Sequence, residues 1–268
     1  MLSPQDDLIG HQLPTTFNHV VSSDDRWTER YWYTGAPKDS GDMMIDLGLG
    51  WYPNKNLMDV FAGVTVDNVQ HSFRGSRRLG NAPLKTRVGP LRFEILEGLK
   101  HHRLVLEENE SGLTFDVHWH ASFKGVEEHQ SFRRKRNRVE EDLTRMTQFG
   151  RMEGWIDLNG RRFQVTPDNW YSQRDHSWGV RSVSQTDMVS GQSLPDYKGF
   201  FWFWVTYQFE DFALSMFFKE REPGNPFFLS ALEIDKNGVE RHIDHVDHDI
   251  AWADDPLGQT WSGGTLDL

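Results

Sequence analysis

The stretch Trp170-Tyr-Ser-Gln-Arg-Asp-His-Ser-Trp-Gly-Val-Arg181 mixes aromatic, charged and titratable side chains in one short segment. In an extended strand, successive side chains point to opposite faces. One predicted face places an imidazole beside indole rings and carries Trp170, Arg174, His176 and Trp178. The other face offers hydrogen-bonding groups and carries Tyr171, Gln173, Asp175 and Ser177. Gly179 would let the backbone bend or another group approach closely.

This segment has two interpretations. It can be a buried polar cluster that links two sheets, with Arg174 and Asp175 satisfying neighbouring groups. It can instead be a functional site around His176, since imidazole changes its charge near neutral pH. A functional site needs His176 to be reachable by solvent or ligand inside a pocket, whereas a scaffold cluster would have both ring nitrogens satisfied by protein.

Outside this segment the chain reads as a series of short strands separated by turn residues. Asn159-Gly160, between two alternating segments, is the strongest hairpin signal. No stretch keeps a helical period, and Glu140 to Met146 is the one moderate helix candidate. Lys124 to Arg138 interrupts the strand pattern and is predicted to be a loop. Many short strands joined by Gly-, Asn- and Asp-containing turns indicate an all-β barrel or sandwich.

Composition restricts the class of protein. The 268-residue chain has 18 Phe, 11 Trp and 6 Tyr, enough to line an apolar cavity, and its lack of Cys excludes disulfides and thiolate sites. A net charge of -11 argues against nucleic-acid binding. The N-terminus lacks the basic and apolar regions of a signal peptide, and the apolar run Phe200 to Val205 is too short to span a bilayer. We therefore expect a cytoplasmic protein with no membrane span.

Three motifs carry a resemblance to a known family: Arg174-Asp-His-Ser-Trp-Gly-Val-Arg181, Gln148-Phe-Gly-Arg-Met-Glu-Gly154 and Glu29-Arg-Tyr-Trp32. They resemble the lipocalin-like proteins related to hydroxyneurosporene synthase (carotenoid 1,2-hydratase) and to AttH. The resemblance implies two lipocalin-like antiparallel β-barrel domains packed side by side. We place them at residues 1–166 and 167–268, with the junction near Pro167. The chain ends where the resemblance would place further strands, so the second barrel is expected to be short or incomplete.

The resemblance also implies hydration or cyclisation of a hydrophobic substrate, with His176 and Trp178 matching the hydratase's His and Trp. The hydratases use a further Tyr and Asp downstream, but Tyr207 and Asp211 are wrongly spaced for that pair. The expected function is therefore a cofactor-independent hydratase, isomerase or cyclase acting on a hydrophobic, terpenoid-, steroid- or polyketide-like small molecule. The alternative is a non-catalytic lipocalin-like carrier of an apolar ligand, because an aromatic-lined barrel binds such ligands without chemistry.

Each candidate residue has a predicted role. His176 would be the proton shuttle, Trp178 and Trp170 the aromatic wall for a cation, and Asp175 the group that orients His176 or another neighbour. The expected ligand-binding residues are Trp170, Arg174, Arg181, Trp202, Trp204 and Tyr31. Protonating an alkene carbon calls for a strong acid, and a buried, protonated carboxyl would serve better than imidazolium. The candidate acids besides Asp175 are Glu29, Asp59 and Asp211.

Two histidine groups raise the alternative of a metal site. His118 and His120 share a predicted strand face, a spacing that zinc enzymes use. His242, His245 and His248 lie among acidic residues, but three-residue spacing sends His245 to the opposite face of a strand. No closed four-ligand pattern appears, so we predict no metal and no cofactor. A carbohydrate-binding role is also open to a Trp-rich β protein, although nothing marks the paired carboxylates of a glycosidase.

Overall fold

The computed structural model describes residues 2–11, 20–135, 137–181, 201–222, 224–254 and 261–268. By their internal contacts these residues divide into two units, Met1–Gln192 and Ser193–Leu268. Each unit is described on its own. The predicted all-β class is confirmed, since strands make up nearly all of the regular structure in the described residues.

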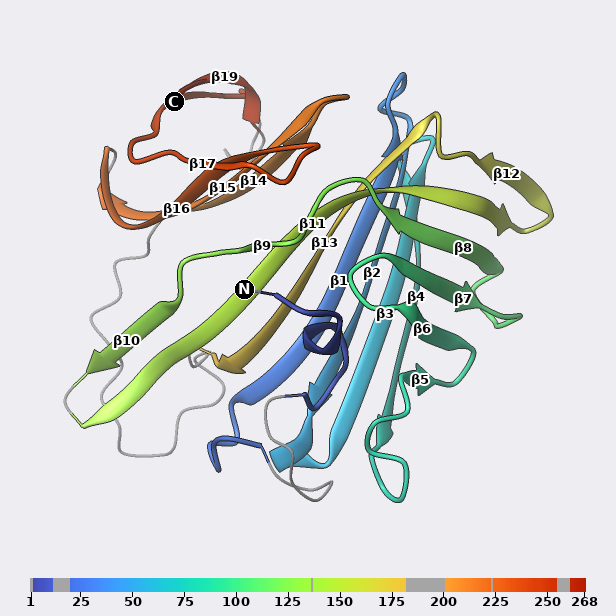
Figure 1. Cartoon of the computed structure of the whole chain (residues 1–268). Coiled ribbons are helices and arrows are strands. Elements are labelled where there is room, and N and C mark those ends of the chain that lie inside the picture. The colour runs from blue at the N-terminus through green and yellow to red at the C-terminus, as the bar shows by residue number, and fades with distance from the viewer. Residues whose placement is uncertain (1, 12–19, 136, 182–200, 223, 255–260) are drawn as a thin grey trace. The chain divides into compact units, whose positions relative to one another are not determined.

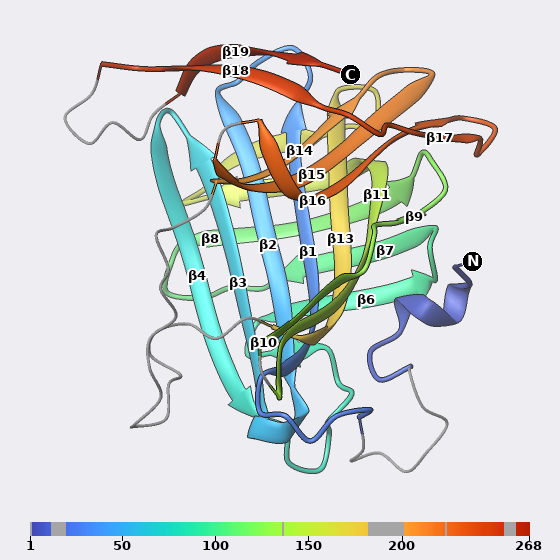
Figure 2. The ribbon, with the colours of Figure 1, turned by 90° about the vertical axis from the view of Figure 1, so that its left-hand side faces the viewer.

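The first unit is one antiparallel sheet that curls into a nearly closed barrel (Figures 1 and 2). Its strands are β1 (Trp27–Pro37), β2 (Met43–Tyr52), β3 (Leu57–Val66), β4 (Val69–Arg78), β5 (Arg87–Val88), β6 (Leu91–Glu97), β7 (His101–Leu106), β8 (Leu113–Ala121), β9 (Val126–Glu127), β10 (Ser131–Lys135), β11 (Arg138–Leu158), β12 (Arg161–Val165) and β13 (Trp170–Val180). The main path is β4-β3-β2-β1-β13-β11-β8-β7-β6-β5, and β9, β10 and β12 pair with β11. Arg77 Nε donates to the carbonyl oxygen of Arg87 at 2.8 Å and links the two edge strands.

The segment Trp170–Val180 is the predicted strand, and it lies in the middle of this sheet. It pairs with β1 on one side and β11 on the other, so that His176 stands opposite both Tyr31 and Met146. The predicted domain junction near Pro167 does not coincide with the division by contacts, because these ladders tie β13 to the first unit. The turn at Pro167 joins β12 to β13 within that unit.

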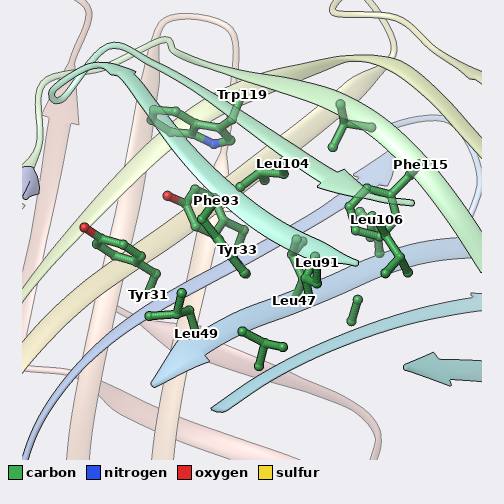
Figure 3. Packing of buried hydrophobic residues seen from close by; sticks show 14 of the residues in the cluster. Tyr31, Tyr33, Leu47, Leu49, Leu91, Phe93, Leu104, Leu106, Phe115 and Trp119 are labelled. Atoms are coloured by element: carbon green, nitrogen blue, oxygen red, sulfur yellow. The ribbon is translucent and has the colours of Figure 1, made fainter. Parts of the chain in front are cut away.

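Alternation along the strands fills the barrel interior with apolar side chains. Figure 3 shows part of this packed core, contributed by β1, β2, β6, β7 and β8: Tyr31, Tyr33, Leu47, Leu49, Leu91, Phe93, Leu104, Leu106, Phe115 and Trp119. The ring centroids of Tyr33 lie 6.0 Å from Phe93 and 6.4 Å from Trp119, within the range of favourable aromatic pairs. Side chains therefore fill this part of the barrel.

Gly179 permits the close approach expected of it. Its φ is +131°, and a Cβ atom at this position would lie 2.0 Å from the carbonyl oxygen of Asp142 on β11. A residue with a side chain would meet both a rarely allowed backbone conformation and a backbone clash. Glycine thus lets β13 pack directly against β11 beside His176.

Two local predictions were wrong. Glu140–Met146, the helix candidate, belongs to the long strand β11, where pairing with β13 and with β9 and β10 outweighs the modest helical preference. The predicted loop Lys124–Arg138 contains β9 and β10, short strands at an edge of β11.

The second unit contains β14 (Phe201–Gln208), β15 (Phe212–Glu222), β16 (Asn225–Asp235), β17 (Glu240–His242), β18 (Asp247–Trp252) and β19 (Trp261–Asp267). In its described residues, the first four form one antiparallel sheet and the last two form another. A small core gathers around Met216 and Phe218. The second barrel expected here stays a prediction. No helix in the described ranges is both long enough and apolar enough to cross a bilayer.

Candidate functional site

A cluster of ionisable side chains is buried inside the first unit. Glu29 comes from β1, His102 from β7, Arg174 and His176 from β13, and Asp7 from the short 3-10 helix η1 (Pro4–Asp7) near the N-terminus. The side chains of all five are fully buried. Buried charges are costly unless they are paired, so this cluster is held together by its internal contacts.

Asp7 is the acceptor at the centre of the cluster. Its carboxylate receives a bidentate pair from Arg174, with Nη1 to Oδ1 at 2.7 Å and Nη2 to Oδ2 at 2.9 Å. It also accepts from His102 Nε2 at 2.8 Å and from the backbone N–H of Leu99 at 2.5 Å. Arg174 donates in addition to Oε1 of Gln148 on β11, at 2.7 Å from Nη2. Each nitrogen of the Arg174 guanidinium and each carboxylate oxygen of Asp7 therefore has a hydrogen-bond partner within the protein.

The N-terminal segment holds Asp7 at this position. Ser3 and Asp6 form reciprocal contacts at the start of η1, and Pro4 occupies the first position, where a missing N–H costs nothing. The side chain of Tyr31 then donates to the carbonyl oxygen of Asp7 at 2.7 Å. The coil of η1 is visible in dark blue in Figure 1. The capped turn of η1 and the hydrogen bond from the buried Tyr31 hydroxyl together hold the carboxylate of Asp7 inside the barrel.

His176 occupies the other half of the cluster. Its Nε2 lies 2.9 Å from Oε1 of Glu29, which stands on the neighbouring strand. Glu29 also accepts from the backbone N–H of Gly10 at 3.0 Å, and His11 Nδ1 lies 3.4 Å from it. The Nδ1 atom of His176 is buried and has no hydrogen-bond partner among the described residues. Its distance of 3.9 Å to Oδ1 of Asp7 is too long for a hydrogen bond.

Trp178 and His11 border the imidazole of His176. The indole ring of Trp178 meets it edge-on with the ring centroids 5.1 Å apart. His11 packs edge-on against Trp178 at 4.7 Å. His176 and Trp178 therefore lie on one face of the strand, and the role of Trp178 as an aromatic wall stays a prediction.

The two carboxylates are ionised. Burial alone would raise the pKa of Asp7, but the charge of Arg174 and the hydrogen bond from His102 hold it well below its usual range. Burial likewise opposes ionisation of Glu29, but the contacts of His11 and His176 lower its pKa to about 2. Glu29 therefore cannot be the protonated carboxyl considered as a strong acid, and it acts as a base or a counter-charge.

The pKa values of His102 and His11 are shifted in opposite directions. Burial and the nearby charge of Arg174 lower the pKa of His102 to about 4, although Asp7 opposes this. His102 is therefore neutral, donating from Nε2 to Asp7 and accepting at Nδ1 from the hydroxyl of Tyr33 at 2.8 Å. Burial would also lower the pKa of His11, but its contacts with Glu29 raise it instead.

We expect acid to unfold the first unit by protonating these carboxylates. Their folded pKa values lie below the usual 3.8 for Asp7 and 4.5 for Glu29. In this pH range the two carboxyls bind more protons in the unfolded chain than in the folded one. Their contribution to the free energy of unfolding is therefore complete above about pH 4.5 and is lost as the pH falls toward 2. Urea denaturation at a series of pH values measures this loss. Glu29→Gln, which lacks one of the two carboxyls, should show a shallower loss, and an equally steep one would contradict the assignment.

Of the two targets predicted for Asp175, His176 or another neighbour, the structure contradicts the first. Asp175 points to the opposite face of β13, where its Oδ2 lies 3.8 Å from Nε of Arg145 and its Oδ1 accepts from Ser177 at 3.4 Å. The carboxylate that contacts the imidazole is Glu29. Alternation along the strand is the physical reason, since neighbouring residues project to opposite sides.

The predicted ligand contacts fall into separate places. Tyr31 and Trp170 are buried in the interior core, and Trp170 also lines an open depression of about 530 Å³ at the end of β13 remote from His176. Arg174 pairs with Asp7. Arg181 lies on the outward face and donates to the hydroxyls of Thr28 and Ser177. Trp202 and Trp204 belong to the second unit, and their role as ligand contacts stays a prediction.

Two groups of described side chains could hold a metal ion. One is inside the barrel and consists of His11, Glu29 and His176. The other consists of His101, His118 and His120, which are partly exposed. In the interior group, Gly10 and the carbonyl oxygen of Leu8 supply further hydrogen bonds, so those side chains are held in place by protein.

Comparisons with known proteins show what this chain is similar to. Among solved structures it resembles a proposed AttH protein from Nitrosomonas europaea, with 14% identity and a TM-score of 0.58, covering 86% of this chain and 73% of that chain. It also resembles kievitone hydratase from Nectria haematococca, with 12% identity and a TM-score of 0.54, covering 89% and 72%. No curated protein sequence gives a significant match.

These structural likenesses confirm the predicted AttH-like fold, while the relation to hydroxyneurosporene synthase stays a prediction. A sequence model of a family of unknown function matches residues 2–247, a range that includes both Asp7 and His176. The chain therefore belongs to the family of unknown function DUF8625.

Proposed function

We propose that this protein is a hydratase-type enzyme that acts without a cofactor on a hydrophobic small molecule, with His176 as its proton carrier. One observation carries the proposal: the fully buried imidazole of His176 has an Nδ1 atom without a hydrogen-bond partner in the described chain. Buried polar atoms are nearly always satisfied, so an exception inside an ionisable cluster marks a place for a ligand.

The surroundings of His176 suit proton transfer. Glu29 holds Nε2 at 2.9 Å, which fixes the ring and stabilises an imidazolium when it forms. Nδ1 is then the nitrogen that exchanges a proton with the ligand. Trp178 borders the ring and can stabilise positive charge on the ligand by about 1–2 kcal/mol when desolvated.

With these roles, His176 can add water across a carbon–carbon double bond and recover its proton. The imidazolium gives the proton on Nδ1 to one carbon of a carbon–carbon double bond, and a water molecule forms a bond to the other carbon. The extra proton of that water returns to Nδ1, so His176 ends in its starting state. Since the acid is an imidazolium and not a neutral carboxyl, the site favours a double bond activated by conjugation or by a neighbouring carbonyl.

The ligand must reach a closed interior. His176 and Glu29 are covered by residues from the N-terminal segment, with Gly10 bonded to Glu29 and His11 packed on Trp178. Access therefore requires residues 2–11 to move away from the strands. Movement of that segment would uncover Tyr31, whose hydroxyl contacts Asp7 and whose ring centroid lies 6.5 Å from that of Phe93. These aromatic surroundings suit a hydrophobic ligand.

The structural likeness to kievitone hydratase supports the reaction class. Kievitone is accordingly the first defined probe, beside a mixed extract of hydrophobic metabolites. The full chain is incubated with each, and products are followed over time by liquid chromatography and mass spectrometry. We expect the wild type to convert a bound compound with gain or loss of one water. His176→Gln should bind the same compound, and its rate of conversion should be lower by about 100-fold or more.

His71→Gln is the matched control, since His71 lies on β4 outside the cluster and should leave conversion unchanged. A compound that wild type and His176→Gln bind equally and leave unchanged would overturn catalysis and favour the carrier function. If the wild type changes the chromatographic retention of a compound without changing its mass, and His176→Gln does not, the reaction at His176 is an isomerisation or cyclisation and not a hydration.

A further inference from the structure

Three histidines from two neighbouring strands meet on the outer face of the barrel. His101 on β7 is the direct cross-strand partner of His120 on β8, and His118 precedes His120 on the same face of β8. Glu153 on β11 is the cross-strand partner of His118. Figure 2 shows β7 and β8 next to each other, and the ladders place β11 beside β8. Residues from three strands therefore converge on one patch.

The rings are already in contact. Nε2 of His101 lies 2.7 Å from Nδ1 of His118, and the rings of His101 and His120 stack with centroids 4.3 Å apart. One possible ligand nitrogen from each ring lies within 4.8 Å of the other two. Oε1 of Glu153 is 3.0 Å from Nε2 of His120. The carboxylate thus fixes the orientation of one imidazole.

We infer that His101, His118 and His120 form a binding site for one zinc ion, with Glu153 positioning His120. Zinc binds imidazole nitrogens at about 2.0–2.1 Å, so tetrahedral ligands lie about 3.4 Å apart. The nitrogens of His101 and His118 lie 2.7 Å apart and must separate by about 0.7 Å to reach this spacing. The rings are partly exposed, which leaves room for that rotation and a path for the ion.

The chemistry of the donors selects the metal class. Imidazole nitrogens favour zinc and its neighbours among the first-row transition metals over calcium or magnesium, which prefer oxygen ligands. A carboxylate that accepts from the second nitrogen of a metal-bound imidazole is the usual supporting contact. Arg103 stands opposite His118 and is neutralised by Asp116, with bonds of 2.9 and 2.6 Å. Arg151 stands opposite His120, and its guanidinium lies over the ring of Tyr171. The carboxylates of Asp116 and Glu153 match the charges of these two arginines, so the patch does not repel a divalent cation.

Zinc at this position would join β7 and β8 directly and β11 through Glu153. The site lies on the outer face of the barrel, so it is independent of the proposed reaction at His176. Since metal binding stabilises only the folded state, zinc should also raise the melting temperature of the wild type.

The test is equilibrium dialysis of the full, untagged chain against zinc chloride. We expect one zinc ion per chain, with binding weakened at least about 100-fold in His118→Ala, where a first ligand is lost, and about 10-fold or more in Glu153→Gln. Cobalt(II) should give the visible absorption of a tetrahedral site in the wild type and lose it in His118→Ala. His71→Ala should bind zinc as the wild type does.

The alternative location is the interior group. His11→Ala removes one of its ligands and leaves the outer patch intact. Zinc that is lost in His11→Ala but kept in His101→Ala and His118→Ala would overturn the inference. So would a wild type that binds no zinc at micromolar concentrations. Circular dichroism of each variant confirms that folding is retained, which the partial exposure of the three rings leads us to expect.

Discussion

Asp7→Asn should lower the free energy of unfolding by about 3–5 kcal/mol, the usual result of breaking a buried ion pair from one side. Asp7 and Arg174 are both fully buried and share two hydrogen bonds. Asparagine keeps the shape but removes the charge, which leaves the guanidinium uncompensated. Its amide group would also face donors on Arg174, His102 and Leu99. Urea denaturation measured by tryptophan fluorescence gives the value.

Asp6→Asn is the matched control on the same turn. Asp6 is partly exposed and contacts Ser3, so its loss should cost less than about 1 kcal/mol. The double variant Asp7→Leu with Arg174→Met removes both charges and should recover much of the loss. A loss below 1 kcal/mol for Asp7→Asn would show that the N-terminal turn does not occupy the barrel in solution.

Glu29→Gln should reduce turnover by about 100-fold or more if His176 is the proton carrier. Glu29 acts through His176, as a positioning residue: its carboxylate holds Nε2 at 2.9 Å and balances the imidazolium. Glutamine keeps an oxygen acceptor near Nε2 but supplies no negative charge. The charged ring then becomes harder to form, so the alkaline limb of the rate profile, where the required imidazolium is lost, should move to lower pH.

A purely structural role of Glu29 would change stability without moving that limb. The chemical shifts of the His176 ring in nuclear magnetic resonance spectra give a second readout that needs no substrate, and they should change in Glu29→Gln because the contact with Nε2 is altered. Asp175→Asn is the matched control on the outward face of β13 and should leave both the rate profile and the ring shifts in place. Unchanged ring shifts in Glu29→Gln would refute the pairing.

The inward face of β13 could be predicted from its residues alone. Arg174, His176 and Trp178 follow the two-residue period of a strand, and that period is a local property of the backbone. The same period places Asp175 on the far side of His176, where it contacts Ser177. The helix candidate at Glu140–Met146 failed because ladder partners far away in the sequence determined its state.

The partners of that face could not be predicted. Asp7 lies in a polar lead-in with no period, and only Pro4 and the Ser3–Asp6 spacing hinted at a capped turn. His102 lies next to His101 in sequence, yet alternation sends one into the interior cluster and the other to the outer patch. His118 and His120 were recognised as a pair on one face, whereas their third member depends on the register of β7 against β8.

The sequence by itself determined the all-β class, the central strand and the side chains that share its inner face, because alternation and turn residues act over a few neighbours. Only the tertiary structure decided which carboxylate neutralises Arg174, which one holds His176, and that three histidines share a patch. These contacts join residues such as Asp7 and Arg174 from opposite ends of the first unit. They depend on strand register and on the curling of the sheet, which no local pattern specifies.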